Sequence, residues 1–340
     1  MSEFLKSLEE TAKPFVVFRL PHSQKINCYY QTDLNVHYTS GFDESGFVFA
    51  PFESQKEFLF IPDTHRAIIA YPETISSSSF ELTIDQYETL ELTKKIDRAK
   101  ANIAAKKFEK VVMSSAFDFP YSAPLADVFF RLEKQHPNAF IYYWYHPETG
   151  YWLGATPERF IALKKGVLST VALAGTLTEK APAEAWTAKE FHEQQLVIES
   201  IAQGLTAAFP EGDVSIGTRE TIHAGRLQHL RTPIDFIHPA LDLNKVIAVL
   251  HPTPAVGGWP KEVATAFIND HEDYDRAYYT GFLGPFHNTR QVDFFVNLRC
   301  ANYQNGEIRL YAGAGITNAS ITSKECEEIY QKAANFLDAL

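Results

Sequence analysis

The chain has 340 residues, of which 45% are hydrophobic, and its formal net charge is −11. This length allows a large core in one large or two medium domains, and the acidic charge argues against nucleic acid as the main partner, because phosphate binding needs a basic surface. No apolar run is long enough to span a membrane, and no secretory signal is recognisable. The three cysteines have neither metal-binding nor disulfide spacing, so we expect a cytoplasmic protein without a membrane partner.

Short apolar runs separated by Pro, Gly and Ser fill residues 1–83, which predicts strands and turns. The charged, alanine-containing stretch Ile84–Lys107 is amphipathic and predicts a helix. A β-type run, KVVMSSAFDF, then begins at Lys110. Later strands and helices alternate without a βαβ rhythm, which favours an α+β fold over a doubly wound sheet. We expect one domain over residues 1–340, with a looser N-terminal part at 1–83 and the remainder at 84–340.

Two further helices are expected in the rest of the chain. Glu184–Phe209 has helical periodicity, and the final helix should begin at a capping box in which Thr322 is the N-cap and Glu325 follows three residues later. Strand-type runs lie around them, and two of these runs should pair as a hairpin across the turn YQNG. The expected strands are Phe140–Tyr145, Tyr151–Leu153, Phe160–Leu163, Leu168–Leu173, a buried Val246–Leu250, and the hairpin pair Asp293–Ala301 and Glu307–Ala312.

Four charged residues could carry chemistry, although each also has an ordinary structural interpretation. Lys110 at a strand start is usually a solvated edge charge, but a buried lysine has a lowered pKa and can act as a base. Glu158, in the small-residue turn GATPERF, is either a solvated loop carboxylate or, in an enclosed site, a protonated acid. Glu193 and Glu328 are expected on helices, either as a boundary residue and an exposed ion-pair partner or as two oxygen ligands for Mg²⁺ in one cleft.

A glycine-containing stretch, AGAG at residues 312–315, directly follows a predicted strand. Glycines there let backbone N–H groups approach an anion closely, although the stretch could equally be a tight strand exit. The G-x-G-x-x-G spacing of a dinucleotide site is absent. An anionic substrate of such an acidic protein would need local positive charge from a metal ion or from a few placed Lys and Arg residues.

Ten short stretches, in this order, resemble the chorismate-utilising enzymes, which include isochorismate synthases, salicylate synthases and the large subunits of anthranilate and aminodeoxychorismate synthases. The resemblance runs from Lys110 to Lys332, about two-thirds of the chain. It implies an α+β fold like that of anthranilate synthase component I, with large antiparallel sheets packed together and helices outside. The stretches are KVVMSS (110–115), GATPE (154–158), LAGT (173–176), KEFHEQQLV (189–197), LQHL (227–230), HPTPAVGG (251–258), DRAYYTGFLG (275–284), NLRCA (297–301), YAGAGI (311–316) and ECEEIYQK (325–332).

The resemblance implies a role for each matching position. Lys110 matches the base that deprotonates an attacking water, and Glu158 matches the acid that protonates the departing C4 hydroxyl of chorismate. Glu193 and Glu328 match the ligands of Mg²⁺. The remaining positions would bind the substrate chorismate, through its carboxylates or beside its ring; they are Gly175, Thr176, His229, Ala255, Val256, Tyr279, Arg299, Gly313, Gly315 and Lys332.

Two positions discriminate among the resembling enzymes. Lys110 indicates water as the nucleophile, because members that add ammonia have glutamine there. Ala174 in LAGT replaces the nucleophilic lysine of aminodeoxychorismate synthases, and no glutaminase subunit is expected. The resemblance therefore favours an isochorismate synthase, an isomerase for menaquinone or siderophore biosynthesis. The alternatives are a salicylate synthase, which also expels pyruvate and toward which Tyr279 leans, and a non-catalytic chorismate-binding protein.

Three residues depart from the usual pattern of these enzymes. Gln194 stands where His is common, and Ser115 and Leu177 each stand where Arg is common. None of the three has an assigned role at the site. The resemblance further implies a monomer or a homodimer.

Overall fold

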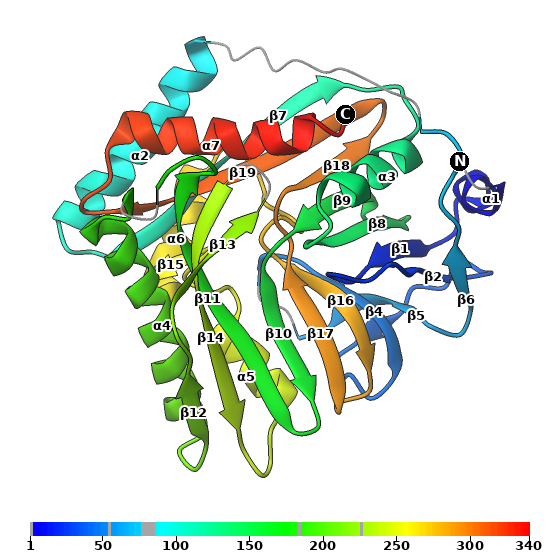
Figure 1. Cartoon of the computed structure of the whole chain (residues 1–340), viewed down its shortest axis with the longest axis horizontal. Helices are drawn as coiled ribbons and strands as arrows, with labels where there is room; N and C mark the ends of the chain where they lie inside the picture. Colours follow the sequence, from blue (N-terminus) through cyan, green and yellow to red (C-terminus); the bar gives the residue numbers. More distant parts are fainter. Residues whose placement is uncertain (1–2, 54–55, 76–85, 183–184, 225–226) are drawn as a thin grey trace.

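The computed structural model describes residues 3–53, 56–75, 86–182, 185–224 and 227–340. Two large antiparallel sheets, here named sheet A and sheet B, dominate the described part of the chain (Figure 1). Helices cover their outer faces, and a third set of buried side chains fills the space between them. The predicted α+β fold, with antiparallel sheets packed together and helices outside, is therefore confirmed.

Sheet A has nine strands among the described residues, and all of its pairings are antiparallel. In order across the sheet, its strands are β15 (Gly258–Trp259), β7 (Lys110–Pro120), β19 (Glu307–Thr317), β18 (Cys300–Gln304), β9 (Gly150–Thr156), β8 (Phe140–His146), β1 (Phe15–Arg19), β2 (Ile26–Tyr30) and β6 (Arg66–Ile69).

Sheet B has ten strands in the same described ranges, and it too is antiparallel. In order, its strands are β12 (Asp213–Ile216), β14 (Leu227–Ile237), β11 (Val167–Thr178), β10 (Arg159–Lys164), β17 (Gln291–Val296), β16 (Phe282–His287), β4 (Ser45–Ala50), β5 (Phe58–Pro62) and β3 (Tyr38–Thr39), with β13 (Glu220–Ala224) paired to β14.

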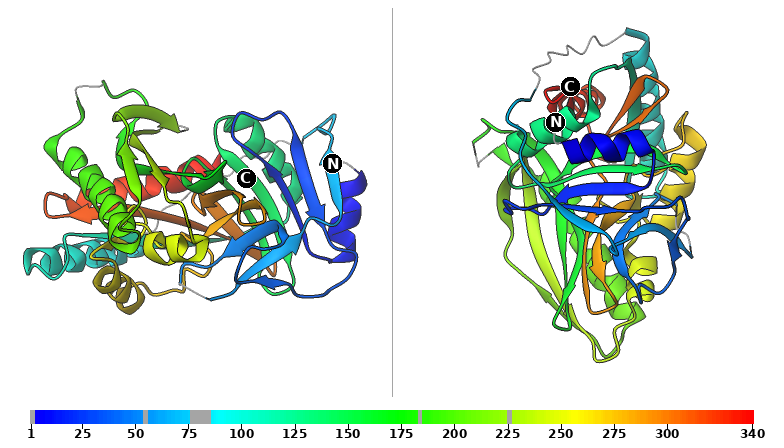
Figure 2. Two further views of the ribbon diagram at one scale, coloured as in Figure 1. Left: turned by 90° about the horizontal axis from the view of Figure 1, so that it is seen from below. Right: turned by 90° about the vertical axis from the view of Figure 1, so that its right-hand side faces the viewer.

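The helices form the outer layers. Helices α2, α3, α6 and α7 pack on the outer face of sheet A, whereas α4 and α5 pack on sheet B. Figure 2 shows α1 at the opposite end of the molecule from α2. None of the helices in the described residues is both long and apolar enough to cross a membrane. Their bounds are α1 (Glu3–Thr11), α2 (Gln86–Ala104), α3 (Leu125–Gln135), α4 (Ala188–Ala208), α5 (Leu243–Leu250), α6 (Lys261–His271) and α7 (Thr322–Leu337).

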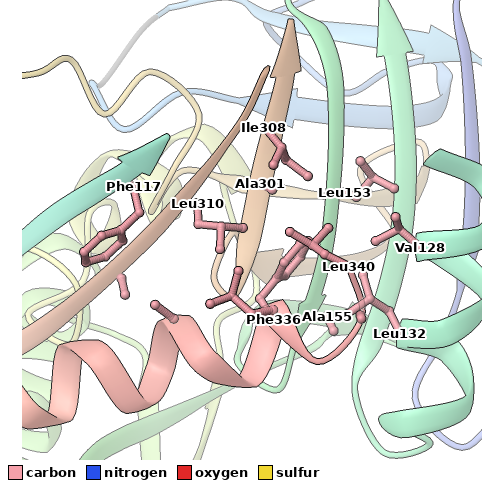
Figure 3. Close-up of a cluster of buried hydrophobic side chains, with 14 of the residues drawn as sticks. Phe117, Val128, Leu132, Leu153, Ala155, Ala301, Ile308, Leu310, Phe336 and Leu340 are labelled. Atoms are coloured by element: carbon pink, nitrogen blue, oxygen red, sulfur yellow. The ribbon is translucent and has the colours of Figure 1, made fainter. Parts of the chain in front are cut away.

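Apolar side chains hold these layers together. Figure 3 shows Phe336 and Leu340, at the end of the chain, packed with Leu132 of α3 against Leu153 and other residues of sheet A. Between the two sheets the core is largely aromatic, and it includes a stacked pair, Phe140 and Phe295, whose ring centroids are 4.2 Å apart. Burial of large apolar side chains is the main favourable term in folding, so this arrangement fixes the sheets that carry the site.

Two of the points at which the chain crosses between the sheets are neighbours in space. The chain leaves sheet A after β9 and enters sheet B at β10, and it returns from β17 to β18. The crossings are tied together by two backbone hydrogen bonds: Val296 N–H donates to the Glu158 carbonyl at 2.9 Å, and Ala155 N–H donates to the Arg299 carbonyl at 3.1 Å. Glu158 and Arg299 are thereby brought together although 141 positions separate their numbers.

Several sequence expectations about secondary structure are wrong. Val246–Leu250 is not a strand but part of α5, whose N-cap Asp242 accepts a hydrogen bond from Lys245 N–H and whose Leu243 and Ile247 share a buried face. Such a short apolar run cannot be assigned by periodicity alone. The stretch 1–83 begins with the helix α1 rather than with strands and turns alone.

The expected hairpin is only partly correct. Strands β18 and β19 do pair across the YQNG turn, but the first half of the stretch 293–301 belongs to β17 of the other sheet. The capping box of α7 is also wrong. The helix begins at Thr322, which donates from Oγ1 to Asp97 at 2.6 Å, while Glu325 forms an ion pair with Lys189 of α4. Tertiary partners have taken both side chains away from the cap.

Candidate active site

A cavity lies beside these two neighbouring crossings between the sheets, closed on the remaining sides by β11, β19, α4 and α7. Elements from distant parts of the sequence therefore build one site. Lys110 stands immediately behind its wall, and the other predicted site residues line it. They are Glu158, Gly175, Thr176, Glu193, His229, Ala255, Val256, Tyr279, Arg299, Gly313, Gly315, Glu328 and Lys332.

Lys110 begins β7 and is fully buried, so it is not a solvated edge charge. Its Nζ lies 3.0 Å from Oε1 of Glu193 on α4. Within the described part of the chain its side-chain nitrogen makes no well-aligned hydrogen bond, which leaves it available to a bound molecule. Gly315 permits this approach, because a Cβ there would collide with Oε1 of Glu193 and crowd Cε of Lys110.

Glu158 follows β9 at the crossing to β10 and is 5% exposed. Burial raises the pKa of its carboxyl to about 7, and the charges of Lys110, Lys332 and Arg299 prevent a larger rise. A carboxylic acid with this pKa carries a proton in a large fraction of molecules at neutral pH. Glu158 is therefore suited to giving a proton to a leaving group.

Glu193 and Glu328 face the cavity from two helices, α4 and α7. Oε1 of Glu328 accepts hydrogen bonds from Thr176 Oγ1 at 3.0 Å and pairs with Lys332 Nζ at 2.7 Å. Burial raises the pKa of the Glu328 carboxyl, but Lys332, Lys189 and the hydrogen bond from Thr176 together outweigh burial and hold this pKa below its ordinary value. Glu328 is therefore an ionised carboxylate at neutral pH.

These two carboxylates are the candidate metal ligands. In the described residues, His, Cys, Asp and Glu side chains nowhere gather in threes as a metal-binding group. Zinc usually needs such a set of three or four protein ligands, whereas Mg²⁺ is commonly held by one or two carboxylates together with water and substrate oxygens. The oxygen-only pair Glu193 and Glu328 therefore fits Mg²⁺.

Arg299 is placed by His229. The Arg299 side chain donates from Nη2 to Nε2 of His229 at 2.9 Å, and Nδ1 of the same ring lies 2.9 Å from the Gly175 carbonyl. Because an arginine can only donate, Nε2 must accept, so Nδ1 carries the ring proton and donates to Gly175. Burial and the neighbouring Arg299 lower the pKa of His229 to about 3, which keeps the ring neutral. Gly175, at φ +76°, supplies the left-handed bend that turns its carbonyl to the ring.

One wall of the cavity is apolar and aromatic. We name it the ring-side wall, because the resemblance places the substrate ring beside it. Tyr279 stacks on Tyr311 with ring centroids 5.1 Å apart and planes 13° from parallel. Ala255 and Val256, from the loop after α5, complete the wall beside them. Several lining residues lie inside the recognised motifs, but the resemblance assigned them no role; they are Val112, Pro157, Leu173, Thr280, Leu298, Tyr311 and Ala312.

The three departures from the usual pattern occupy different places. Gln194 is fully buried and donates from Nε2 to Thr232 Oγ1 at 2.7 Å and to the Ala172 carbonyl at 3.3 Å, so it anchors α4 to sheet B. Ser115 and Leu177 lie on β7 and β11 and do not line the cavity.

Comparison with known proteins identifies the family of this chain. The family model described as chorismate binding enzyme matches residues 56–340. The chain belongs to this family of chorismate-binding enzymes. The resemblance inferred from ten ordered stretches is thus confirmed, and the match extends beyond them into the N-terminal third of the chain.

Isochorismate synthases are similar to this chorismate-binding enzyme in sequence. The salicylate biosynthesis isochorismate synthase of Pseudomonas aeruginosa is 32% identical over 266 residues, which cover 72% of this chain and 54% of that protein. Isochorismate synthase MenF of Escherichia coli is 33% identical over 258 residues, 71% of this chain and 58% of that protein. The chain therefore spans a little over half the length of these relatives.

The fold comparison reaches further along the chain than the sequence comparison. The solved structure of MenF, the menaquinone-specific isochorismate synthase from Escherichia coli, matches 96% of this chain and 88% of that chain with a TM-score of 0.80. The sequences are 22% identical over this match, so the likeness shows a shared fold.

Proposed function

We propose that this protein is an isochorismate synthase, an isomerase that converts chorismate reversibly to isochorismate with Mg²⁺. The observation that carries the proposal is the juxtaposition of the buried Lys110 and Glu158 with two carboxylates, Glu193 and Glu328, around one cavity. The names of the sequence relatives support the same reaction. The product would serve menaquinone or siderophore biosynthesis; the sequence relatives include isochorismate synthase MenF, 33% identical, and isochorismate synthase EntC, 29% identical, both of Escherichia coli.

In the proposed reaction water adds at C2 of the ring, both ring double bonds shift, and the C4–O bond breaks. Lys110 receives the proton of the attacking water. Glu158 gives its proton to the departing C4 hydroxyl, which leaves as water. One water enters and one leaves, so the overall change is an isomerisation. The pKa of about 7 at Glu158 provides the protonated acid that the leaving group needs.

Binding of the substrate would use the cations around the cavity. Chorismate carries two carboxylates, and Arg299 and Lys332 both line the cavity. The backbone N–H groups of Gly313 and Gly315 on β19 would contribute further donors. Mg²⁺ held by Glu193 and Glu328 would offset the charge of a substrate carboxylate. Local positive charge of this kind allows a protein of net charge −11 to hold a dianion.

Water rather than ammonia is the proposed nucleophile, because Lys110 replaces the glutamine of the ammonia-adding enzymes. Ala174, which lines the cavity, cannot form the covalent adduct of aminodeoxychorismate synthases. We therefore propose that the protein works without a glutaminase subunit and is a monomer or a homodimer. We also propose a cytoplasmic location, because the three cysteines are buried free thiols, as is usual in a reducing compartment.

The direct test incubates the purified protein with chorismate and MgCl₂, separates the products by chromatography, and repeats the reaction with EDTA. We expect a mixture of chorismate and isochorismate that forms only with metal. Salicylate and pyruvate would instead identify a salicylate synthase. Binding of chorismate without any product would identify a non-catalytic chorismate-binding protein.

A further inference from the structure

A buried ion pair, Glu272 with Arg276, lies behind the ring-side wall of the cavity. The two side chains are 1% and 2% exposed. The guanidinium donates from Nη2 to Oε1 at 2.6 Å and from Nε to Oε2 at 2.7 Å, which is the parallel, bidentate geometry of a strong Arg–carboxylate pair. Neither residue lines the cavity, so any effect on bound substrate must act through other residues.

The remaining donors of Arg276 all reach the cavity wall. Nη2 donates to the Val112 carbonyl at 2.7 Å, and Nη1 donates to the Val256 carbonyl at 2.9 Å and to Thr280 Oγ1 at 3.3 Å. With the two bonds to Glu272, these contacts use the five N–H donors of a guanidinium. Val112, Val256 and Thr280 come from three separate segments, and all three line the cavity.

Glu272 holds the strand that carries the candidate base. Its Oε1 accepts hydrogen bonds from Ser114 N–H at 2.8 Å and from Ser114 Oγ at 2.6 Å. Alternate residues of a strand share a face, so Lys110, Val112 and Ser114 lie on the same face of β7. The ion pair therefore holds β7 at Val112 and at Ser114, which lie two and four residues after Lys110.

Arg276 also contacts two neighbouring residues of the cavity wall, Tyr279 and Thr280. Its guanidinium carbon lies 5.7 Å from the ring centroid of Tyr279, within the range of a cation–π contact. Thr280 has a left-handed backbone at φ +61°, which is strained for a β-branched residue. Such strain persists only where the surroundings hold the residue in place, and Arg276 is one of its partners.

We propose that the Glu272–Arg276 pair is a positioning unit of the active site. It sets the positions of Val112, Val256 and Tyr279 in the cavity wall and, through β7, the direction from which Lys110 meets the attacking water. The inference rests on the proposed function. A buried ion pair is not in itself a strong source of stability, and an apolar pair of similar volume often stabilises a core as well, so positioning accounts for the pair better than folding does.

The test is the variant Arg276→Lys, which keeps the charge but cannot span the three wall contacts from one ammonium. A displacement near 1 Å costs roughly 10²-fold in rate, so kcat should fall by about that factor while KM for chorismate changes by less than about threefold. The solvent deuterium isotope effect on kcat should increase, because proton transfer from water becomes limiting. Arg309→Lys is the matched control, since Arg309 forms a bidentate pair with Asp118 on the same two strands, β7 and β19, at an exposed position.

Ser114→Ala keeps the test decisive if Arg276→Lys does not fold. It removes one hydrogen bond to Glu272 and should lower kcat severalfold, again with a larger isotope effect. Wild-type kcat and isotope effect in a folded variant would overturn the positioning role. A fall in kcat that only follows the loss of folded protein, with an unchanged isotope effect, would overturn it too. Wild-type protein that makes no product from chorismate would instead overturn the proposed function and this inference with it.

Discussion

Replacing Glu158 with glutamine should affect stability and activity in opposite directions. Glutamine has the shape of the protonated acid but cannot ionise. The pKa of this carboxyl is about 7 in the folded protein because of burial, against an ordinary value of 4.5. The folded state therefore binds the proton more tightly than the unfolded state. The contribution of this carboxyl to wild-type stability is full below about pH 4.5 and is lost as the pH rises through about 7.

The difference between the two pKa values corresponds to a change of ~3 kcal/mol in the free energy of unfolding. The free energy of unfolding of Glu158→Gln, relative to that of wild type, should therefore increase by up to about 3 kcal/mol from pH 4 to pH 8. Denaturant unfolding at both pH values measures this difference. The exposed Glu307→Gln is the control and should show no such gain. A stability difference that does not change with pH, or that shrinks as the pH rises, would refute this account of the buried acid.

The same variant should lose activity by roughly 10²- to 10⁴-fold, the usual contribution of a general acid. Wild-type kcat/KM should fall about tenfold for each pH unit above the pKa of about 7, because only the protonated acid can act. The pH–rate profile of Glu158→Gln should lack this basic limb. A variant that keeps the limb would show that another group causes it.

Three further predictions concern the other members of the site. Lys110→Gln should lower turnover by at least about 10²-fold in the chromatographic assay, and unchanged turnover would remove Lys110 as the base. Glu193→Gln and Glu328→Gln should each weaken Mg²⁺ binding about tenfold or more in titration calorimetry with a non-reactive substrate analogue, and wild-type affinity in both would remove them as ligands. His229 should show the Nδ1-protonated tautomer by ¹⁵N NMR and stay neutral down to about pH 5, consistent with its pKa of about 3; a ring that titrates near pH 6.5 would contradict its role as acceptor for Arg299.

Much of the site could be predicted because its residues lie in short motifs at the ends of elements. GATPE and NLRCA mark two neighbouring crossings between the sheets, and the resemblance that these motifs carry assigned Glu158 and Arg299 to one substrate site. The secondary structure was less predictable where a signal was short or was overridden. Val246–Leu250 contains five apolar or small residues without a clear period, and the cap at Asp242 was the signal that would have identified α5.

Tertiary contacts account for most of what sequence reasoning missed. The capping box expected at Thr322 failed because Glu325 is more strongly bound by Lys189, at 2.6 Å across two helices. Glu272 and Arg276 are four residues apart, yet their role depends on carbonyl groups of β7 and of the loop after α5. No local pattern in the sequence records which carbonyl groups will be near an arginine.

In the proposed reaction, water adds to the ring of chorismate at this site with the help of Mg²⁺. We would incubate the protein with chorismate and MgCl₂ in H₂¹⁸O and measure the mass of the earliest product. We expect isochorismate that carries one ¹⁸O atom at C2 and does not form in EDTA. Isochorismate without the label, or product formation that is unaffected by EDTA, would contradict the proposed reaction.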